Sequence, residues 1–323
     1  MIRCAVLDDY QEVALQMADW QALAGRVDVT VHHEHFEDQD ELVEALRDQQ
    51  VVVIMRERTP FGADLLARLP ELRLLVTSGM RNASIDLEAA AAAGVTVCGT
   101  ASTSEPPVEL TWALILGLAR NLVTENNSLR AGGPWQRTVG MGLAGKTLGL
   151  AGFGKIGVRV ARIGRAFGMN VTAWSANLTN YRTEPEGVRL VSKEELLAGS
   201  DVVSIHLVLS DRTRGLIDAD ALRLMRPTSL LINTSRAAIV DERALVDALA
   251  QARIAGAGLD VFSQEPLPAN HPFRKLPNVL ATPHLGYVTD GNYATYFREA
   301  VENIQAFIDG SPIRTLGTAA APR

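Results

Sequence analysis

Short β-rich runs alternate with helical segments along almost the whole chain, and this alternation limits the possible folds more than any other feature. Strands that are separated by helices are typical of parallel sheets whose faces those helices cover. Five β-rich runs lie in the N-terminal third, at 3–8, 27–31, 51–55, 72–77 and 95–99. Six more follow Lys146, at 147–152, 170–174, 201–207, 229–234, 254–262 and 278–283. The sequence therefore predicts an α/β protein with two parallel sheets.

Two long helical segments have no strand of their own. One begins at Pro106 and Pro107, which suit the first turn of a helix, and we expect a single helix over 105–130 that links the two sheets. The other, from about residue 290 to 310, is amphipathic, so we expect it to pack on the first sheet. We expect the tail beyond it, 318–323, to be frayed. The mass of 34.8 kDa is sufficient for two domains with separate cores.

Charge and composition favour a small-molecule partner. The formal net charge is −6, so the chain lacks the basic surface that nucleic-acid binding requires. No apolar run approaches the ~18 residues of a membrane span, and no leader segment precedes the first β-rich run. Cys4 and Cys98 lie in apolar runs, and we expect them to be buried free thiols in a reducing compartment. We therefore expect a cytoplasmic protein whose partners include neither nucleic acid nor a membrane.

Three histidines stand among acidic residues in the segment 31–41: His32, His33 and His35. Their spacing matches no standard zinc pattern. An exposed turn before a helix explains this composition equally well. We therefore predict no metal site.

A glycine motif opens the second series of strands. Gly152, Gly154 and Gly157 directly follow a β-rich run and begin a helical segment, which leads to the next run at 170–174. This βαβ context, within about 30 residues, places a pyrophosphate on a helix N-terminus. Without the context, the motif would indicate only a glycine-rich turn. We therefore predict a dinucleotide site whose loop also contains Phe153, Lys155 and Ile156.

The end of the run 170–174 bears on which dinucleotide binds. NAD-binding proteins usually carry an acid there, which holds the ribose 2′-hydroxyl. This chain has Ser175, Ala176 and Asn177 instead, so Ser175 takes the cofactor-binding position of the acid. A 2′-phosphate is not repelled there, but no adjacent arginine binds it, and Arg182 is the nearest in sequence. The prediction is NAD or NADP, with the choice open.

Three polar residues follow successive strands of the second series. Arg236 follows 229–234, Glu265 follows 254–262, and His284 comes directly after Pro283, which ends the run 278–283. The carboxyl ends of parallel strands share one edge of a sheet, where ligands bind. Each residue also has a structural alternative: a surface pair for Arg236, a solvated loop acid for Glu265, and a turn residue for His284. If the three converge, they lie over the cofactor crevice.

Taken in order, these segments resemble the NAD(P)-dependent D-isomer specific 2-hydroxyacid dehydrogenase family. The resemblance rests on 143–157, 201–217, 230–242, 256–266 and 278–289, and it extends toward the N-terminus through 75–86 and 108–120. It implies two doubly wound parallel-sheet domains, Rossmann-like or flavodoxin-like, separated by a cleft. It also implies a discontinuous substrate-binding domain, 1–104 plus 286–323, around a dinucleotide-binding domain, 105–285, with an interdomain helix at 105–130.

The resemblance implies an oxidoreductase that transfers a hydride between NAD or NADP and C2 of a small 2-keto or 2-hydroxy acid, the D-isomer. Arg236 would bind the substrate carboxylate, His284 would be the acid/base, and Glu265 would orient His284 and favour its charged form. A homodimer is implied, with the interdomain helix in its interface. Backbone amides of Gly79, Met80 and Arg81 would bind the substrate. The cofactor would be lined by His206, Thr234, Ser235 and Asp260, of which His206 is equally well explained as a core residue.

Two positions depart from the family pattern: Val208 stands where proline is common, and Ala237 stands where glycine is usual. Neither removes a catalytic group. Two alternative functions remain open. One is a non-catalytic, dinucleotide-sensing scaffold of the corepressor type, which the intact Arg236, Glu265 and His284 argue against. The other is a dehydrogenase of a related anion, formate or phosphite. The sequence does not specify which 2-hydroxy acid is the substrate.

Overall fold

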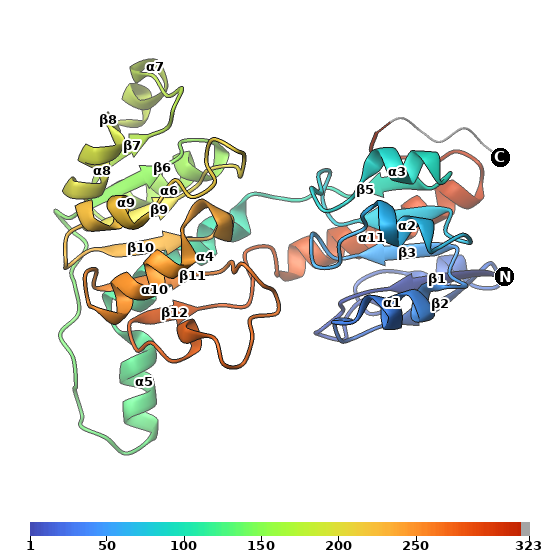
Figure 1. The fold of residues 1–323 in the computed structure, drawn as a ribbon, viewed down its shortest axis with the longest axis horizontal. Coiled ribbons are helices and arrows are strands. Elements are labelled where there is room, and N and C mark those ends of the chain that lie inside the picture. Colours follow the sequence, from blue (N-terminus) through green and yellow to red (C-terminus); the bar gives the residue numbers. More distant parts are fainter. Residues whose placement is uncertain (318–323) are drawn as a thin grey trace. The chain divides into compact units, whose positions relative to one another are not determined.

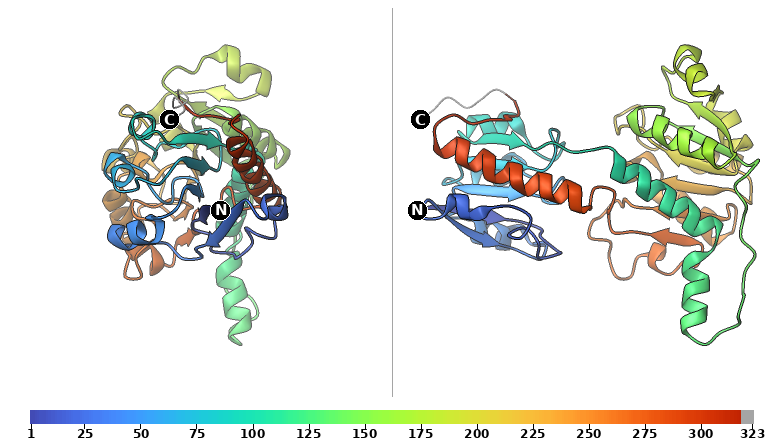
Figure 2. Two further views of the ribbon diagram at one scale, coloured as in Figure 1. Left: turned by 90° about the vertical axis from the view of Figure 1, so that its right-hand side faces the viewer. Right: turned by 180° about the vertical axis from the view of Figure 1, so that it is seen from behind.

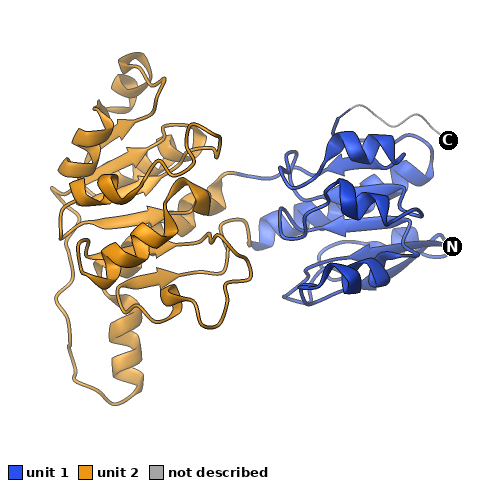
Figure 3. Ribbon diagram, in the orientation of Figure 1, with its two compact units in different colours: residues 1–103, 289–323 blue, residues 104–288 orange. Residues whose placement is uncertain are grey.

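The computed structural model describes residues 1–317, and the tail expected to fray, 318–323, lies outside them. The chain divides into two compact units (Figure 3). Unit 1 combines Met1–Thr103 with the C-terminal segment that begins at Thr289, and unit 2 is Ser104–Val288.

Unit 1 is built on a five-stranded sheet in which every strand pair is parallel. The strand order, β2-β1-β3-β4-β5, is that of flavodoxin-like folds. Helices α1, α2 and α3 cover one face and α11 lies along the other (Figures 1 and 2). The bounds are β1 Ile2–Val6, β2 Val27–Val31, α1 Gln39–Leu46, β3 Val51–Ile54, α2 Ala63–Ala67, β4 Leu74–Thr77, α3 Leu87–Ala92, β5 Thr96–Gly99 and α11 Asp290–Ile308.

Unit 2 contains a seven-stranded parallel sheet in the order β12-β11-β10-β9-β6-β7-β8, which extends the Rossmann order by one strand. The six predicted strands are all present, but β8, a two-residue edge strand, was not predicted. The strands are β6 Thr147–Ala151, β7 Asn170–Trp174, β8 Arg189–Leu190, β9 Val202–Ile205, β10 Leu230–Asn233, β11 Gly256–Leu259 and β12 Val279–Ala281.

Helices cover both faces of the unit 2 sheet, so each face has its own core. One core lies under α8 Lys193–Gly199, α9 Ala219–Leu224 and α10 Glu242–Ala250. The other lies under α4 Glu105–Ala119 and α6 Lys155–Ala166. Because the strands are buried on both faces, they are short, continuous apolar runs rather than alternating ones. This property made them recognisable in the sequence.

The single helix expected over 105–130 is in fact two helices. Helix α4 ends at Ala119, Asn121 adopts a left-handed backbone with φ 51°, and α5 continues over Leu122–Arg130. The chain returns after α5, and the Met141 amide donates to the Ala119 carbonyl at 2.6 Å. A carbonyl at the end of α4 is thus paired with a residue 22 positions further along the chain. Helix α5 stands away from the unit 2 sheet (Figure 1).

Both cysteines are buried free thiols, as expected. Burial raises the pKa of Cys4 to about 12 and that of Cys98 to about 11. Within residues 1–317, no helix is both long and apolar enough to cross a membrane. The same residues include no group of three or more His, Cys, Asp or Glu side chains placed to hold a metal ion.

Candidate active site

The site in unit 2 lies where the strand order reverses. Strand β6 has β7 on one side and β9 on the other, so the connections from β6 and β9 leave the sheet in opposite directions. In open α/β sheets, this switch point forms a crevice at the carboxyl ends of the strands. The glycine loop follows β6 there, and a cavity of about 450 Å³ extends along the ends of β6, β7 and β9.

The three glycines of the loop differ in the space that surrounds a Cβ at each position. Gly152 has φ 106°, and a Cβ there would lie 2.4 Å from the His206 carbonyl oxygen. A Cβ at Gly157 would lie 2.4 Å from the Gly152 carbonyl oxygen, so both positions require glycine for packing. At Gly154, a Cβ would meet no atom of the chain within 4 Å, so the space beside this backbone is open. The loop therefore leaves room for a ligand only at its middle glycine, as a pyrophosphate site requires.

The remaining residues of the glycine loop frame this opening. Helix α6 begins at Lys155, its N-cap is Gly154, and its first turn contains no acidic residue. Its unpaired amides can therefore face an anion. Phe153 is buried, Lys155 is exposed and Ile156 is half-buried. These features fit a dinucleotide.

Glu265 and His284 are in direct contact. Glu265 Oε2 lies 2.6 Å from His284 Nδ1, and Glu265 Oε1 accepts a hydrogen bond from the Phe262 amide at 2.8 Å. Both side chains retain some exposure, 28% for Glu265 and 21% for His284. Partial burial raises the pKa of Glu265, but its hydrogen bond with His284 and the charges of His284 and Arg236 outweigh burial and lower it. Glu265 is therefore a carboxylate at neutral pH.

The turn that carries His284 is held by Asp260, which is buried. Its Oδ1 accepts from Thr282 Oγ1 at 2.7 Å and from the Leu285 amide at 2.7 Å, and its Oδ2 accepts from the Gly286 amide at 2.8 Å. His284 has φ 53°, a left-handed conformation that non-glycine residues rarely adopt. Burial is the largest influence on Asp260 and raises its pKa despite these bonds. One carboxylate thus binds the Thr282 side chain before the histidine and two backbone amides after it.

Arg236, Thr234 and Ser235 follow β10 at the same edge of the sheet. Arg236 Nη1 donates to the Ser235 carbonyl at 2.8 Å, and the charge of Arg236 acts on Glu265. Thr234 Oγ1 lies 2.9 Å from Thr111 Oγ1 of α4, and Ser235 Oγ donates to the Ile205 carbonyl at 2.8 Å. Arg236, Glu265 and His284 therefore lie together at one edge.

His206 lies in the crevice at the carboxyl end of β9. His206 follows β9 and lines the cavity, and its Nε2 lies 2.9 Å from Ser204 Oγ. Burial lowers its pKa to about 4, so the ring is neutral at physiological pH. Val208 is exposed, and Ala237 has no positive φ. Neither departure from the family pattern therefore strains the backbone.

Gly79, Met80 and Arg81 belong to unit 1, where they follow β4. Gly79 has φ 86°, is buried and donates its amide to Thr100 Oγ1 at 2.9 Å. Met80 and Arg81 are exposed. The Gly79 amide is therefore already paired in this structure, and the amides of the other two residues lie on an exposed loop.

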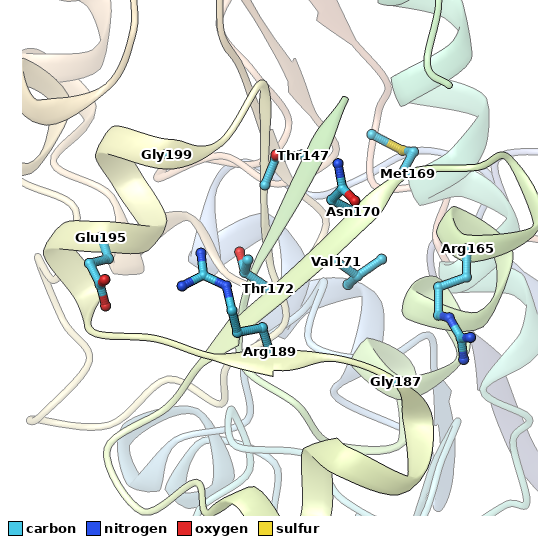
Figure 4. Close-up of a pocket in the computed structure, with 10 residues that line it drawn as sticks. All are labelled: Thr147, Arg165, Met169, Asn170, Val171, Thr172, Gly187, Arg189, Glu195 and Gly199. Atoms are coloured by element: carbon cyan, nitrogen blue, oxygen red, sulfur yellow. The ribbon is translucent and has the colours of Figure 1, made fainter. Parts of the chain in front are cut away.

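Another pocket of unit 2 lies at the opposite edge of the sheet (Figure 4). Thr147 and Asn170, the first residues of β6 and β7, line it, so it is remote from the glycine loop that follows β6. Arg165 and Arg189 stand well apart in this view, with β7 between them. Because its arginines do not converge, we assign this pocket no role.

The cavity also has two arginines that were not among the predicted site residues: Arg182, from helix α7 (Asn180–Thr183), and Arg212, from the loop after β9. Arg182 Nη2 donates to the Phe153 carbonyl of the glycine loop at 2.8 Å. The absence of an acid at Ser175 was the sequence signal that pointed to this region. That signal did not indicate which arginines line the cavity beside Ser175.

Residues 112–286 match the family model described as D-isomer specific 2-hydroxyacid dehydrogenase, NAD binding domain. The chain is also 42% identical over 256 residues to a glyoxylate reductase from Aeropyrum pernix, an alignment that covers 76% of each protein. The chain belongs to the D-isomer specific 2-hydroxyacid dehydrogenase family. As a member, it is an oxidoreductase that transfers a hydride between NAD or NADP and C2 of a 2-keto or 2-hydroxy acid.

Two further family members show how the similarity extends. A D-3-phosphoglycerate dehydrogenase from Methanocaldococcus jannaschii is 34% identical over 90% of this chain, which spans only 54% of that relative's length. The crystal structure of a phosphoglycerate oxidoreductase from Vibrio cholerae O395 matches with a TM-score of 0.92 and 39% identity, covering 96% of this chain and 100% of that one. The predicted fold class, two doubly wound parallel-sheet domains, is confirmed.

Proposed function

We propose that Arg236, Glu265 and His284 are the catalytic residues of this dehydrogenase. The observation that carries the proposal is the 2.6 Å contact between Glu265 Oε2 and His284 Nδ1 at the edge where Arg236 emerges. Because Glu265 is ionised, it accepts a hydrogen bond from Nδ1–H of His284, which keeps the proton on Nδ1 and leaves Nε2 as the reactive nitrogen. Nε2 donates a proton to the C2 oxygen during keto-acid reduction and takes it back during oxidation.

Arg236 has the chemistry to orient the substrate. A guanidinium pairs with a carboxylate through two parallel hydrogen bonds, which fix both the position and the plane of the substrate's carboxylate. C2 is bonded to that carboxylate, so it is then fixed as well. The developing negative charge on the C2 oxygen is met by the imidazolium of His284.

The cofactor site follows from the crevice of unit 2. The loop Gly152–Gly157 and the start of α6 would hold the pyrophosphate, and the nicotinamide supplies the hydride for reduction or accepts it in oxidation. Ser175 would face the adenosine ribose. Four residues at the ends of β9, β10 and β11 would line the rest of the site: His206, Thr234, Ser235 and Asp260.

We also propose the domain roles that the family resemblance implies. Residues 105–285 would bind the dinucleotide, and 1–104 with 286–323 would bind the substrate. In the latter, the backbone amides of Met80 and Arg81 would hold the substrate carboxylate, whereas the expected Gly79 amide is already bonded to Thr100 Oγ1. The identity to a named glyoxylate reductase makes glyoxylate the first 2-keto acid to test.

The test is a steady-state assay of NADH and NADPH oxidation over a panel of 2-keto acids that begins with glyoxylate. We expect His284→Ala to lower kcat by about two to four orders of magnitude, with nucleotide binding unchanged by titration calorimetry. We expect Arg236→Ala to raise KM more than His284→Ala does, because it removes the carboxylate anchor. Unchanged turnover in His284→Ala would refute the catalytic assignment.

We propose a homodimer in which α5 and the loop after it form part of the interface. The apolar side chains of α4 are largely buried within unit 2, whereas those of the α5 segment are exposed: Leu122, Val123, Leu129, Trp135 and Val139. Exposed apolar clusters of this kind are typical of protein contacts. Light scattering should give twice the chain mass, and Leu122→Asp with Leu129→Asp should give the monomer mass.

We also propose a cytoplasmic location. Two buried, unpaired thiols suit a reducing compartment, and a nicotinamide-dependent reductase needs access to a nucleotide pool. Cell fractionation with a tagged chain would test this location.

A further inference from the structure

The cavity at the ends of β6, β7 and β9 offers positive charge to a ligand and no negative charge. Arg182 and Arg212 are among its lining residues, and no Asp or Glu is. Within residues 1–317, neither arginine forms an ion pair with a carboxylate. The ring of His206, which also lines the cavity, is neutral. The cavity is therefore suited to an anionic group.

The position of this charge corresponds to one part of a dinucleotide. In a Rossmann domain, the adenosine ribose lies at the end of the second strand of the βαβ unit, which is β7 here. Ser175, Ala176 and Asn177 follow β7, and a bond from the Leu178 amide to the Ser175 carbonyl, 3.0 Å long, closes them into a turn. The side chains of Ser175 and Asn177 can donate hydrogen bonds at this point, whereas an acid could only accept them.

Arg182 is held close to the nucleotide loop. Its Nη2 donates to the Phe153 carbonyl at 2.8 Å, so the guanidinium lies beside the glycine loop. One of its five N–H donors is used in this bond, and the others remain for a ligand. Arg212 lines the same cavity from the loop after β9, close to Ser210 and Thr213. The two guanidinium groups come from separate segments of the chain but line one cavity.

We propose that this dehydrogenase prefers NADP(H) to NAD(H), and that Arg182 and Arg212 bind the 2′-phosphate with Ser175 and Asn177. The proposal rests on the proposed nucleotide site and extends it to the choice of coenzyme. A phosphate monoester carries nearly two negative charges at neutral pH and accepts strong hydrogen bonds from guanidinium groups. NAD(H) has only hydroxyls at this ribose, and no carboxylate lines the cavity to bind them.

The test uses two nucleotides that cannot undergo the reaction, 2′,5′-ADP and 5′-AMP, in titration calorimetry with the full chain. We expect 2′,5′-ADP to bind at least about tenfold more tightly. Arg182→Ala and Arg212→Ala should each weaken 2′,5′-ADP binding about five- to fiftyfold and leave 5′-AMP binding unchanged. Arg214→Ala is the matched control, since Arg214 is exposed in the same loop and does not line the cavity. It should change neither affinity.

Ser175→Asp is the converse variant, because it places a carboxylate at the end of β7. We expect it to reverse the preference, with weaker 2′,5′-ADP binding and tighter NADH binding. The parent preference should also fall as salt rises, because the extra contacts are ionic. Equal affinity of the parent for both nucleotides would overturn the proposal, as would an equal loss of both in Arg182→Ala, which would indicate a purely structural bond to Phe153.

These outcomes separate the coenzyme choice from the reaction. If the nucleotides bind equally and NADH supports keto-acid reduction, the coenzyme proposal fails and the proposed function stands. If 2′,5′-ADP binds preferentially and no keto acid is reduced, the coenzyme proposal stands and the catalytic roles fail.

Discussion

Replacing Glu265 by glutamine tests the proposed proton-transfer pair, Glu265 and His284, most directly, because glutamine keeps the shape of the side chain and removes its charge. The glutamine oxygen can still accept from the Phe262 amide, so the loop keeps its 2.8 Å bond. The amide nitrogen then faces His284 Nδ1. An amide donates where the carboxylate accepted, so the neutral ring takes the tautomer with its proton on Nε2, and the imidazolium loses its counter-charge.

The size of the effect follows from the geometry of the pair. Both side chains are partly exposed, so the effective dielectric between them is about 40–80. Opposite charges 2.6 Å apart then attract by roughly 1.6–3.2 kcal/mol. This agrees with about 1.5–3 kcal/mol for a hydrogen bond to a charged group. At about 1.4 kcal/mol for each tenfold change, we expect kcat for keto-acid reduction to fall about 10- to 200-fold.

The assay is kcat and KM for reduction as a function of pH. In Glu265→Gln kcat should fall throughout the pH range in which the parent is active, because the imidazolium has lost its carboxylate partner, while KM changes less than about threefold. Glu242→Gln is the matched control: Glu242 Oε1 lies 3.3 Å from His271 Nε2, and this pair has similar exposure. It should keep kcat within about twofold. A Glu265→Gln enzyme with the parent's kcat at every pH would refute the proposed role of the pair.

Three further predictions concern stability and binding. Because the pKa of Glu265 is lowered in the folded state, its stabilising effect is fully present above its ordinary value of 4.5 and is lost as pH falls through the lower folded value. In urea unfolding, the difference in free energy of unfolding between the parent and Glu265→Gln should therefore shrink below pH 4.5. A difference that stays constant with pH would contradict this. Asp260→Asn should lower kcat at least about tenfold without abolishing nucleotide binding, because an amide nitrogen facing the Gly286 amide disrupts the turn that follows His284; unchanged kcat would contradict this. Gly154→Ala should keep the parent's unfolding midpoint and weaken nucleotide binding at least about tenfold, because its Cβ would enter the space left for the ligand. Gly152→Ala should destabilise the fold by more than about 2 kcal/mol, because its Cβ would collide with the His206 carbonyl. Equal stability of the two variants would contradict this difference between the glycines.

Most of the strands were predictable because each is a short apolar run between turn residues, the pattern of a strand buried on both faces, whereas β2 was recognisable as a β-rich run although only one of its residues is fully buried. The exception, β8, has only two residues and lies at the sheet edge, so it has no run to recognise. The break between α4 and α5 also lay outside the reach of periodicity. There the Ala119 carbonyl accepts a hydrogen bond from the Met141 amide of a returning loop, a contact between residues far apart in sequence.

The proposed catalytic residues Arg236, Glu265 and His284 were predictable in type and order, since each follows a strand of one parallel sheet. Their mutual distances were not, because they depend on the loops after those strands. The cavity arginines illustrate the limit. Ser175 showed that an acid is missing, but Arg182 is seven positions further along the chain and Arg212 follows a different strand. Only the folded chain brings both to one cavity.

Asp260 shows how a predicted role and an observed contact can belong to one group. The family resemblance implies that it faces the nicotinamide, whereas the structure uses it to hold the turn around His284 through three hydrogen bonds. A carboxylate offers about four acceptor positions, so one remains for a ligand donor. The carboxylate that fixes the left-handed backbone of His284 can therefore also bind the nucleotide. We therefore expect nucleotide binding to stabilise the turn around His284 in the parent. In Asp260→Asn it should no longer do so, because the carboxylate that binds both the turn and the nucleotide is lost. Hydrogen exchange of the Leu285 and Gly286 amides, with and without bound nucleotide, measures this stabilisation. Protection that rises on binding in the parent but not in Asp260→Asn supports the shared role of Asp260. An equal rise in both proteins refutes it.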